Sequence, residues 1–278
     1  MSGKKLEALR LPKVGTGQNP ILSSDFGSQK PMFPARLNTR EFPPAGAHIA
    51  LAGRADDGEF YFCKDDRSGQ PIRLREFVFS SLAQEVGLPT PGFRVIEDDL
   101  TGETFFGSRR LPSTASDAAK KRFLRTERRD ELGRHVDFPG RWLSQLHIFD
   151  MFLDNWDRSI DNIIALEDGS RLRLCPIDFA AAELANAPPD RFPVAETETV
   201  TVAKLLRIVH GFFPDSAHQM LTKIGAVPSA VFGSFFEGLP FEWTDQRERD
   251  SLCDFWASQR LGYRIDALRS KLDDGQVL

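Results

Sequence analysis

Two short polar segments near the middle of the chain constrain its fold more than any other feature. The first is Asp154-Asn155-Trp156-Asp157-Arg158-Ser159-Ile160-Asp161-Asn162, and the second is Cys175-Pro176-Ile177-Asp178-Phe179-Ala180. Between them, apolar runs at 163–166 and 172–177 flank a Glu167-Asp168-Gly169 turn, a pattern typical of a β-hairpin. Because the two strands of a hairpin start and finish side by side, we expect Asn162 and Asp178 to lie close together.

The residue types in these segments meet the needs of phosphoryl transfer. Asp157 precedes Arg158 and stands five residues before Asn162, which is the Asp-to-Asn spacing of a kinase catalytic loop. Asp157 would orient the attacking hydroxyl or accept its proton, and Asn162 and Asp178 would offer Mg²⁺ the hard oxygen ligands that it prefers. We therefore predict ATP and Mg²⁺ as cofactors, Asp157 and Arg158 as catalytic residues, and Asn162 and Asp178 as metal ligands.

Simpler interpretations of these segments explain less. A polar turn after a helix would account for the first segment alone, but not for the later Ile177-Asp178-Phe179. An aspartate in such an apolar run is costly to bury unpaired, so Asp178 either binds a cation or is capped. A calcium loop would need the turn glycine and terminal glutamate of an EF-hand, which are missing. There is no HExxH, no GxSxG and no His/Cys cluster, so the sequence offers no zinc site or serine-hydrolase motif.

A lysine at the end of a predicted strand is the candidate phosphate ligand. Lys64 ends the strand-like run 59–64, which forms a hairpin with residues 48–53. Glu76 lies in the first turn of a helix predicted at 73–86 and would pair with Lys64. Two alternatives stay open: Lys64 is a solvated strand end, and Glu85 on the same helix competes with Glu76. No GxGxxG occurs, and the loops that would cover phosphates, Gly46–His48 and Ser23–Ser28, are also explained as ordinary turns.

The order of the predicted elements indicates a two-lobed α+β protein. A hairpin, one helix and two strands at 93–97 and 103–108 come first, and helices with one embedded hairpin follow. The expected helices are at 118–134 and 141–153, with several between 200 and 271 that end in a long one at about 245–271. The predicted division is an extended arm at 1–45, a β-rich lobe at 46–111 and a larger, mostly helical lobe at 112–278.

Composition excludes several classes of partner and location. The chain has 278 residues, 36 Lys+Arg and 40 Asp+Glu, and a formal net charge of −4, so no charge excess favours nucleic-acid or membrane binding. No run approaches the roughly 18 apolar residues of a membrane span, and no apolar segment of a signal peptide follows Met1. Three scattered cysteines, Cys63, Cys175 and Cys253, suit a reducing compartment. The expected location is therefore cytoplasmic.

Asn155-x-Asp157-Arg158-x-x-x-Asn162 followed by Ile177-Asp178 resembles the HipA-like kinases and, more distantly, the phosphatidylinositol 3- and 4-kinases. The resemblance covers roughly residues 44–215 and includes the turn Gly87-Leu88-Pro89-Thr90-Pro91. It implies a bilobal protein-kinase-like fold, ATP with Mg²⁺, and transfer of the γ-phosphate to a protein Ser or Thr. It also implies a hinge at Phe105–Arg110, where Phe106 and Ser108 would contact the nucleotide together with Lys64 and Glu76.

The sequence departs from the family pattern in two ways. Ser159 stands where many relatives have His, and we expect no counterpart of the N-terminal subdomain of full-length HipA toxins. A toxin role does not follow from the resemblance, although a regulatory partner protein remains an expectation. Two other functions stay open: a kinase for a small molecule or lipid headgroup, and a nucleotide-binding pseudokinase or scaffold. An acidic acceptor loop would favour a cationic small molecule, and Asp190, Glu196 and Glu198 are present there.

Overall fold

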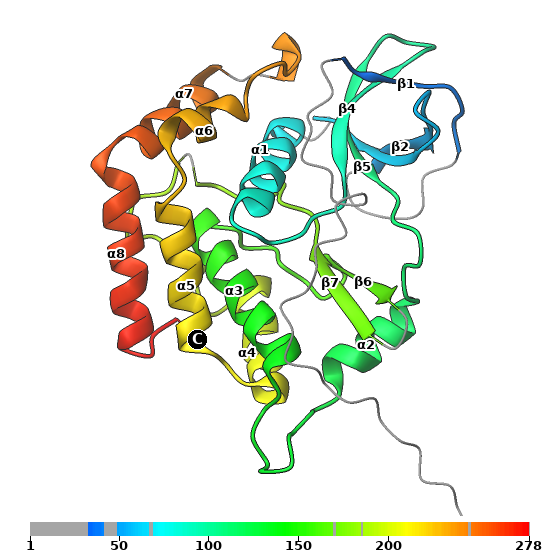
Figure 1. Cartoon of the computed structure of the whole chain (residues 1–278). Helices are drawn as coiled ribbons and strands as arrows, with labels where there is room; N and C mark the ends of the chain where they lie inside the picture. Colours follow the sequence, from blue (N-terminus) through cyan, green and yellow to red (C-terminus); the bar gives the residue numbers. More distant parts are fainter. Residues whose placement is uncertain are drawn as a thin grey trace, which may run out of the picture.

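The computed structural model describes residues 33–41, 49–66, 69–168, 171–184, 186–243 and 246–277. These residues have the two-lobed α+β architecture that the sequence predicts. A five-stranded sheet forms one lobe and helices form the other, with α1 (Ile72–Glu85) between them (Figure 1). The chain leaves the sheet at Arg109 and enters the first helix of the larger lobe at Asp117, so the predicted boundary at residue 111 lies in this connection.

The sheet of the smaller lobe has the spatial order β1-β4-β5-β3-β2, in which β1 pairs with β4 in parallel and the other neighbours are antiparallel. Both predicted strand pairs are confirmed. The strands are β1 (Ala35–Leu37), β2 (Ile49–Arg54), β3 (Phe60–Lys64), β4 (Phe93–Asp98) and β5 (Thr104–Arg109).

The segment predicted as an extended arm at 1–45 contains a short strand, β1, that the sequence analysis did not predict. Ala35 and Leu37 are buried against β4, and Arg36 between them is exposed. Three residues are too few to show a period of two in the sequence, so only pairing with β4 reveals this strand. The candidate loops Gly46–His48 and Ser23–Ser28 lie outside the described residues.

Both faces of the sheet are apolar, and one of them carries α1. Side chains alternate along each strand, and directly paired residues point to the same face. Lys64 pairs with Phe106, so its side chain leaves the sheet on the face that packs against α1. On that face Phe77 of α1 meets the rings of Phe93 and Phe106 edge-on, at 5.0 and 6.5 Å between centroids. The register of β3 with β5 therefore aims Lys64 at α1.

The helix α1 confirms the prediction for residues 73–86 within one residue at each end. Leu74, Val78 and Leu82 recur at helical spacing, and all three are completely buried. The chain turns away at Gly87, whose φ of 84° lies in the left-handed region that glycine adopts at helix ends. With an apolar sheet on one side and the larger lobe on the other, α1 is buried over most of its circumference.

The larger lobe is built around α3, whose Phe149 and Phe152 are completely buried. The hairpin predicted between the two polar segments is confirmed as β6 and β7. In the described ranges, no helix combines the length and apolarity needed to cross a bilayer. The elements are α2 (Asp117–Arg125), α3 (Asp137–Leu153), β6 (Ile163–Asp168), β7 (Arg171–Pro176), α4 (Glu198–His210), α5 (Pro214–Gly225), α6 (Ser229–Ser234), the 3₁₀ turn η1 (Phe241–Trp243), α7 (Gln246–Ala257) and α8 (Gln259–Asp273).

Two helix predictions in this lobe are wrong at one end or in the middle. The helix expected at 118–134 stops at Arg125, where Thr126 is extended and its hydroxyl donates to the Arg122 carbonyl at 2.6 Å. Further on, Asp130 accepts hydrogen bonds from the N–H groups of Leu132 and Arg134, which folds these residues into a turn. The long final helix expected at 245–271 is two helices. Ser258 breaks it, since its hydroxyl accepts a hydrogen bond from the Arg260 N–H and so begins α8.

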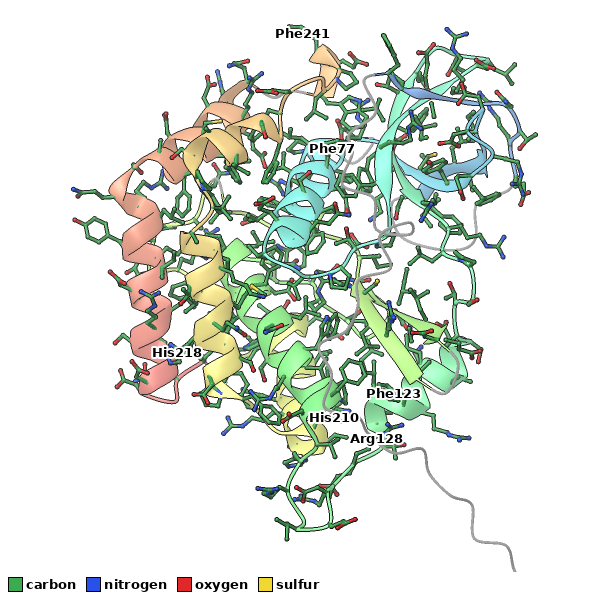
Figure 2. The ribbon with its side chains drawn as sticks, in the orientation of Figure 1. Phe77, Phe123, Arg128, His210, His218 and Phe241 are labelled. Atoms are coloured by element: carbon green, nitrogen blue, oxygen red, sulfur yellow. The ribbon has the colours of Figure 1, made fainter. Side chains whose placement is uncertain are left out.

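Side chains that Figure 2 labels at the lower end of the molecule fix the end of α2, Arg128 from the segment that follows it and His210 from α4. The guanidinium of Arg128 lies 4.5 Å from the centroid of the Phe123 ring. The Nε2 of His210 donates to the carbonyl of Leu124 at 2.8 Å. The His210 contact holds α2 against α4, and the lysines of α2 pair with Asp161 (described below).

The last described residues return to the middle of α3. The Nε2 of His147 donates a hydrogen bond to the Val277 carbonyl at 3.1 Å, and both residues are buried. Burial lowers the pKa of His147 below its ordinary value of 6.5, although the Val277 carbonyl and Asp150 raise it. His147 is therefore neutral in the folded protein.

We expect the His147→Gln variant to change how stability depends on pH. In the parent chain, only the unfolded state takes up a proton at this position as the pH falls below 6.5. Acid therefore lowers the stability of the parent through His147, and it has no such effect on the variant. The free energy of unfolding of the parent should fall relative to the variant by up to about 1.4 kcal/mol per pH unit below 6.5. Urea denaturation between pH 5 and pH 8 measures this, and a difference that does not vary with pH would contradict it.

Candidate active site

The first polar segment is a loop that begins buried at Asp154 and Asn155 and reaches the surface at Trp156 and Asp157. It follows α3 at Asp154, which has a left-handed φ of 55°, a conformation that aspartate tolerates better than most residues. Arg158 is only 3% exposed, whereas Trp156 and Asp157 reach the surface. The loop therefore presents Asp157 outward while its neighbour Arg158 points into the protein.

Arg158 is the residue that ties this loop to its surroundings. Its Nε and Nη2 donate to the two oxygens of Asp150 on α3, at 2.8 and 2.9 Å. Its Nη1 donates to the carbonyls of Asn162, at 3.0 Å, and of Ile177. The same guanidinium lies 4.9 Å from the centroid of the Phe179 ring. One buried cation thus joins α3, the loop and the residue that precedes Asp178, which makes Arg158 a positioning residue.

Two supporting residues of the loop were missed by the sequence analysis. The hydroxyl of Thr199, at the start of α4, accepts from the Arg158 N–H at 2.9 Å and donates to the Asn155 carbonyl at 2.7 Å. Asp150 also accepts a hydrogen bond from Asn155 Nδ2 at 2.7 Å. A signal for Asp150 was present in the sequence, since it is the one acidic residue in the apolar run 146–153. Thr199 gave no signal, because its contacts span more than 40 residues.

The second segment and the smaller lobe meet at Lys64. Its Nζ donates to Glu76 Oε1 at 2.6 Å and to Asp178 Oδ1 at 2.9 Å. The side chain of Lys64 is 12% exposed, and those of Glu76 and Asp178 are 2% and 22% exposed. The solvated-strand-end interpretation of Lys64 is therefore wrong, and Glu76 rather than the exposed Glu85 is its partner.

Lys64 lies between two carboxylates whose pKa values shift in opposite directions. Burial raises the pKa of Glu76 to about 7, and the Lys64 ammonium opposes this rise. Burial would also raise the pKa of Asp178, but Lys64 and Arg158 hold it below its ordinary value. Asp178 thus keeps its charge at neutral pH, which a metal ligand requires, and Glu76 is the carboxylate that holds a proton more readily.

The backbone around Asp178 is strained and anchored on both sides. Asp178 has a left-handed φ of 65°, which is uncommon for a residue other than glycine. The next residue, Phe179, is completely buried and meets the Phe149 ring edge-on at 5.8 Å. The N–H of Phe179 donates to Glu76 Oε1 at 3.1 Å. The buried phenylalanine and the Glu76 carboxylate hold the chain in the conformation that turns Asp178 toward Lys64.

The hairpin brings the predicted metal ligands to one edge, as expected. Ile163 pairs with Pro176, and the Ile177 N–H donates to the Asn162 carbonyl at 3.0 Å. The Nδ2 of Asn162 donates to the Asp157 carbonyl at 2.9 Å, so its amide oxygen is the atom left for another partner. Among the described residues, no group of three or more His, Cys, Asp or Glu is placed to hold a metal ion. A cation here would need oxygen atoms from a bound phosphate to complete its shell.

The remaining predicted residues lie nearby in different environments. Phe106 is 3% exposed and packs on Phe77 and Phe93, so its ring belongs to the aromatic cluster that supports α1. Ser108 is half-buried, two residues further along β5 and on the same face. Asp161 is exposed and pairs with Lys121 at 2.9 Å and Lys120 at 3.6 Å, so it fixes the loop to α2.

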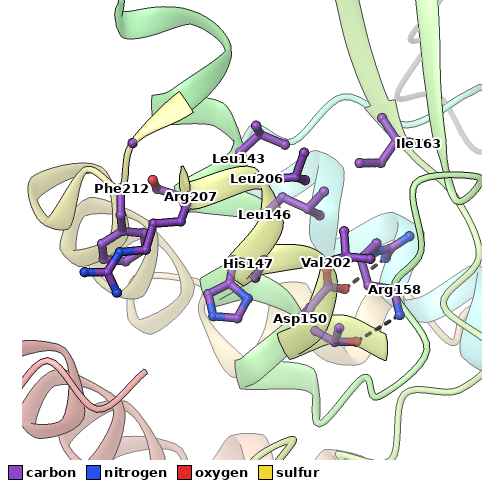
Figure 3. A pocket seen from close by; sticks show the side chains of 14 residues that line it. Leu143, Leu146, His147, Asp150, Arg158, Ile163, Val202, Leu206, Arg207 and Phe212 are labelled. Carbon is purple, nitrogen blue, oxygen red and sulfur yellow. Dashed lines mark hydrogen bonds and ion pairs between the residues drawn. The ribbon is translucent and has the colours of Figure 1, made fainter. Parts of the chain in front are cut away.

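A cavity of about 30 Å³ lies behind the loop, between α3 and α4 (Figure 3). Its walls are largely apolar, from residues such as Leu143, Leu146 and Leu206, and the Asp150–Arg158 pair closes its inner end. It contains none of the other predicted site residues. The cavity is therefore part of the support of the loop and is separate from the surface that carries Asp157 and Asp178.

Comparison with known proteins agrees with this arrangement. The family model described as HipA-like kinase matches residues 44–187, just over half of the chain. A search of curated proteins found no match. Among solved structures, the Helicobacter pylori proinflammatory kinase CtkA superposes with a TM-score of 0.56 at 11% identity, covering 85% of this chain and 96% of that one. This likeness shows a shared kinase fold.

Two further solved structures are less similar. The Golgi casein kinase with Mn/ADP bound has a TM-score of 0.47 at 11% identity, and the match covers 86% of this chain and 75% of that chain. The HipA of Shewanella oneidensis MR-1, in a complex with HipB and operator DNA, has a TM-score of 0.46 at 12% identity and covers 79% of this chain and 60% of that chain.

We expect Arg158→Met to be strongly destabilising, because it leaves the carboxylate of Asp150 buried without its cation. Breaking a buried pair in this way costs about 3–5 kcal/mol. The matched control is Arg269→Met in the surface pair with Asp266, where the two side chains are 40% and 73% exposed and the expected loss is about 0–1 kcal/mol. Urea denaturation at pH 7 measures both, and equal losses would contradict the central place given to Arg158.

Proposed function

The chain belongs to the HipA-like kinase family, and we propose that it transfers the γ-phosphate of ATP, with Mg²⁺, to a serine or threonine hydroxyl of a protein. The observation that carries the proposal is the contact of Lys64 with both Glu76 and Asp178. It joins the sheet, α1 and the end of the β6–β7 hairpin in one cluster. A cation from one lobe and a carboxylate from the other thus face the same space, as phosphoryl transfer requires.

The donor atoms at the hairpin edge fit Mg²⁺. Asp178 offers a carboxylate that stays ionised, and Asn162 offers an amide oxygen turned away from its own hydrogen bond. Both are the hard oxygen ligands that Mg²⁺ takes in small number, alongside phosphate and water. When bound, the ion would neutralise negative charge on the phosphates. Lys64, held by Glu76, would direct its ammonium at the α- and β-phosphates.

Asp157 is the residue that we propose acts on the acceptor hydroxyl. It is exposed, and the buried Arg158 next to it fixes the backbone that carries it. From this position its carboxylate would orient the acceptor hydroxyl and take up its proton. Trp156, 45% exposed beside it, offers an apolar surface for a side chain next to the acceptor residue, which favours a polypeptide over a small polar acceptor.

We also propose a cytoplasmic location. The three cysteines are unpaired, and burial raises the pKa of Cys63 and Cys175 to about 12, so these two thiols stay protonated. Unpaired thiols suit a reducing compartment.

We expect Asp157→Ala to lower phosphate transfer by about 10²–10⁴-fold, because the acceptor loses its general base. Asp178→Asn should abolish transfer that depends on Mg²⁺. The matched control is Asp161→Asn, an exposed neighbour paired with Lys121, which should stay close to the parent rate. Intact-mass spectrometry after incubation with ATP and Mg²⁺, with the chain alone and with a protein acceptor mixture, measures the transfer.

The other outcomes separate the alternatives. Stabilisation of the parent by Mg-ATP in a thermal shift, with no phosphate gained by any protein, would replace the proposal by a small-molecule kinase or a pseudokinase. No stabilisation and no transfer would refute nucleotide binding itself. Unchanged transfer in Asp178→Asn would show that the metal ligands are assigned to the wrong residues.

A further inference from the structure

The position of α1 decides whether Lys64 is held at the candidate site. Glu76 in the first turn of α1 accepts hydrogen bonds from Lys64 Nζ at 2.6 Å and from the Phe179 N–H at 3.1 Å. A small movement of α1 would lengthen both contacts at once. Pro71, the residue before the helix, makes no side-chain cap, and the Asp66 carboxylate accepts a hydrogen bond from the Arg73 N–H at 2.9 Å instead. Side chains outside the helix therefore hold its first turn in place.

Arg75 is the residue of α1 that reaches the C-terminal helices. Neighbouring positions on a helix point about 100° apart, so Arg75 faces away from Lys64 when Glu76 faces it. The Nε and Nη2 of Arg75 donate to the two carboxylate oxygens of Glu248 on α7, at 2.7 and 3.3 Å. Its Nη1 donates to the Ala180 carbonyl at 3.3 Å, two residues after Asp178. Arg75 and Glu248 are 7% and 8% exposed.

The segment before α7 makes its own contacts with β5 and α1. Trp243 in η1 is 1% exposed, and its Nε1 donates to the Thr104 hydroxyl at 2.7 Å. The guanidinium of Arg73, two residues before Arg75, donates to the Thr104 carbonyl at 2.8 Å and lies 5.4 Å from the Trp243 ring centroid. Figure 2 shows the η1 segment, with Phe241, directly beyond α1, with Phe77. α7 therefore begins at a point already fixed to β5 and α1.

We propose that Glu248 is a positioning residue for the phosphotransfer site, acting through Arg75 to hold α1 where Glu76 meets Lys64. The inference rests on the proposed function and extends it to α7, more than 170 residues from the helix that it holds. A buried, bidentate pair suits this role because both charges are satisfied in one geometry only. Shifting α1 along or around its axis would leave a buried guanidinium and a buried carboxylate unpaired.

The test is a double-mutant cycle between Glu248→Ala and Glu76→Gln. We expect Glu248→Ala alone to lower phosphate transfer by about 10–100-fold, as misplaced catalytic groups do. If Glu248 acts through Glu76, adding it to Glu76→Gln should produce no further loss, because residues that act as a unit are not additive. The control is Asp98→Ala, which removes a buried carboxylate paired with Arg40 outside α1 and should multiply its effect with that of Glu76→Gln.

A second measurement tests the contact between Arg75 and Glu248 without substrate or nucleotide. Hydrogen exchange of residues 72–85 should be at least about tenfold faster in Glu248→Ala than in the parent, and unchanged in Asp98→Ala. Should Glu248→Ala fail to fold, the exchanged pair Arg75→Glu with Glu248→Arg replaces it. This double variant keeps the ion pair and loses the Ala180 contact, so we expect α1 exchange nearer to the parent than in Arg75→Glu alone.

Two results would overturn the inference. One is α1 exchange in Glu248→Ala that equals the parent, and the other is transfer losses of Glu248→Ala and Glu76→Gln that multiply. Because the exchange measurement needs no phosphate transfer, it distinguishes failure of this inference from failure of the proposed function. A parent chain that transfers no phosphate but shows faster α1 exchange in Glu248→Ala would refute the kinase activity and retain the role of Glu248 in holding α1.

Discussion

The ion pair of Arg158 with Asp150 is the interaction on which the candidate site depends. Both side chains are almost completely buried, and a buried pair is stable only when its remaining donors and acceptors are satisfied. Here the remaining donor of Arg158 is taken by the carbonyls of Asn162 and Ile177. The need to satisfy one cation therefore sets the path of the loop and the end of the hairpin together, and leaves Asp157 on the surface.

A second charged contact joins the lobes. Lys64 binds Glu76 on α1 and Asp178 after β7, so the sheet, α1 and the hairpin share one ammonium group. Two carboxylates surround one ammonium group, so the cluster carries excess negative charge, and burial makes Glu76 the carboxylate whose pKa rises. A divalent cation with a phosphate anion would change this balance. The same charges that hold the lobes together are thus those that a nucleotide and metal would engage.

Local patterns predicted much of this protein because they reflect local physics. The β2–β3 and β6–β7 hairpins follow from a period of two and from turn residues, and α1 follows from a period near 3.6. The same reasoning failed where the decisive bond was a single side chain. Asp130 folds residues 130–134 into a turn and Ser258 divides the final helix, because one carboxylate or hydroxyl accepts hydrogen bonds from backbone N–H groups, which a periodic pattern cannot show.

The sequence by itself supplied the candidate groups Asp157, Asn162 and Asp178, together with the hairpin that brings the last two to one edge. Only the tertiary structure decided which carboxylate meets Lys64, that Arg158 points inward, and that Glu248 supports α1. The contacts of Lys64 with Asp178 and of Arg75 with Glu248 span 114 and 173 residues. Such contacts depend on how buried surfaces pack, and packing is a property of the whole chain that no local pattern encodes.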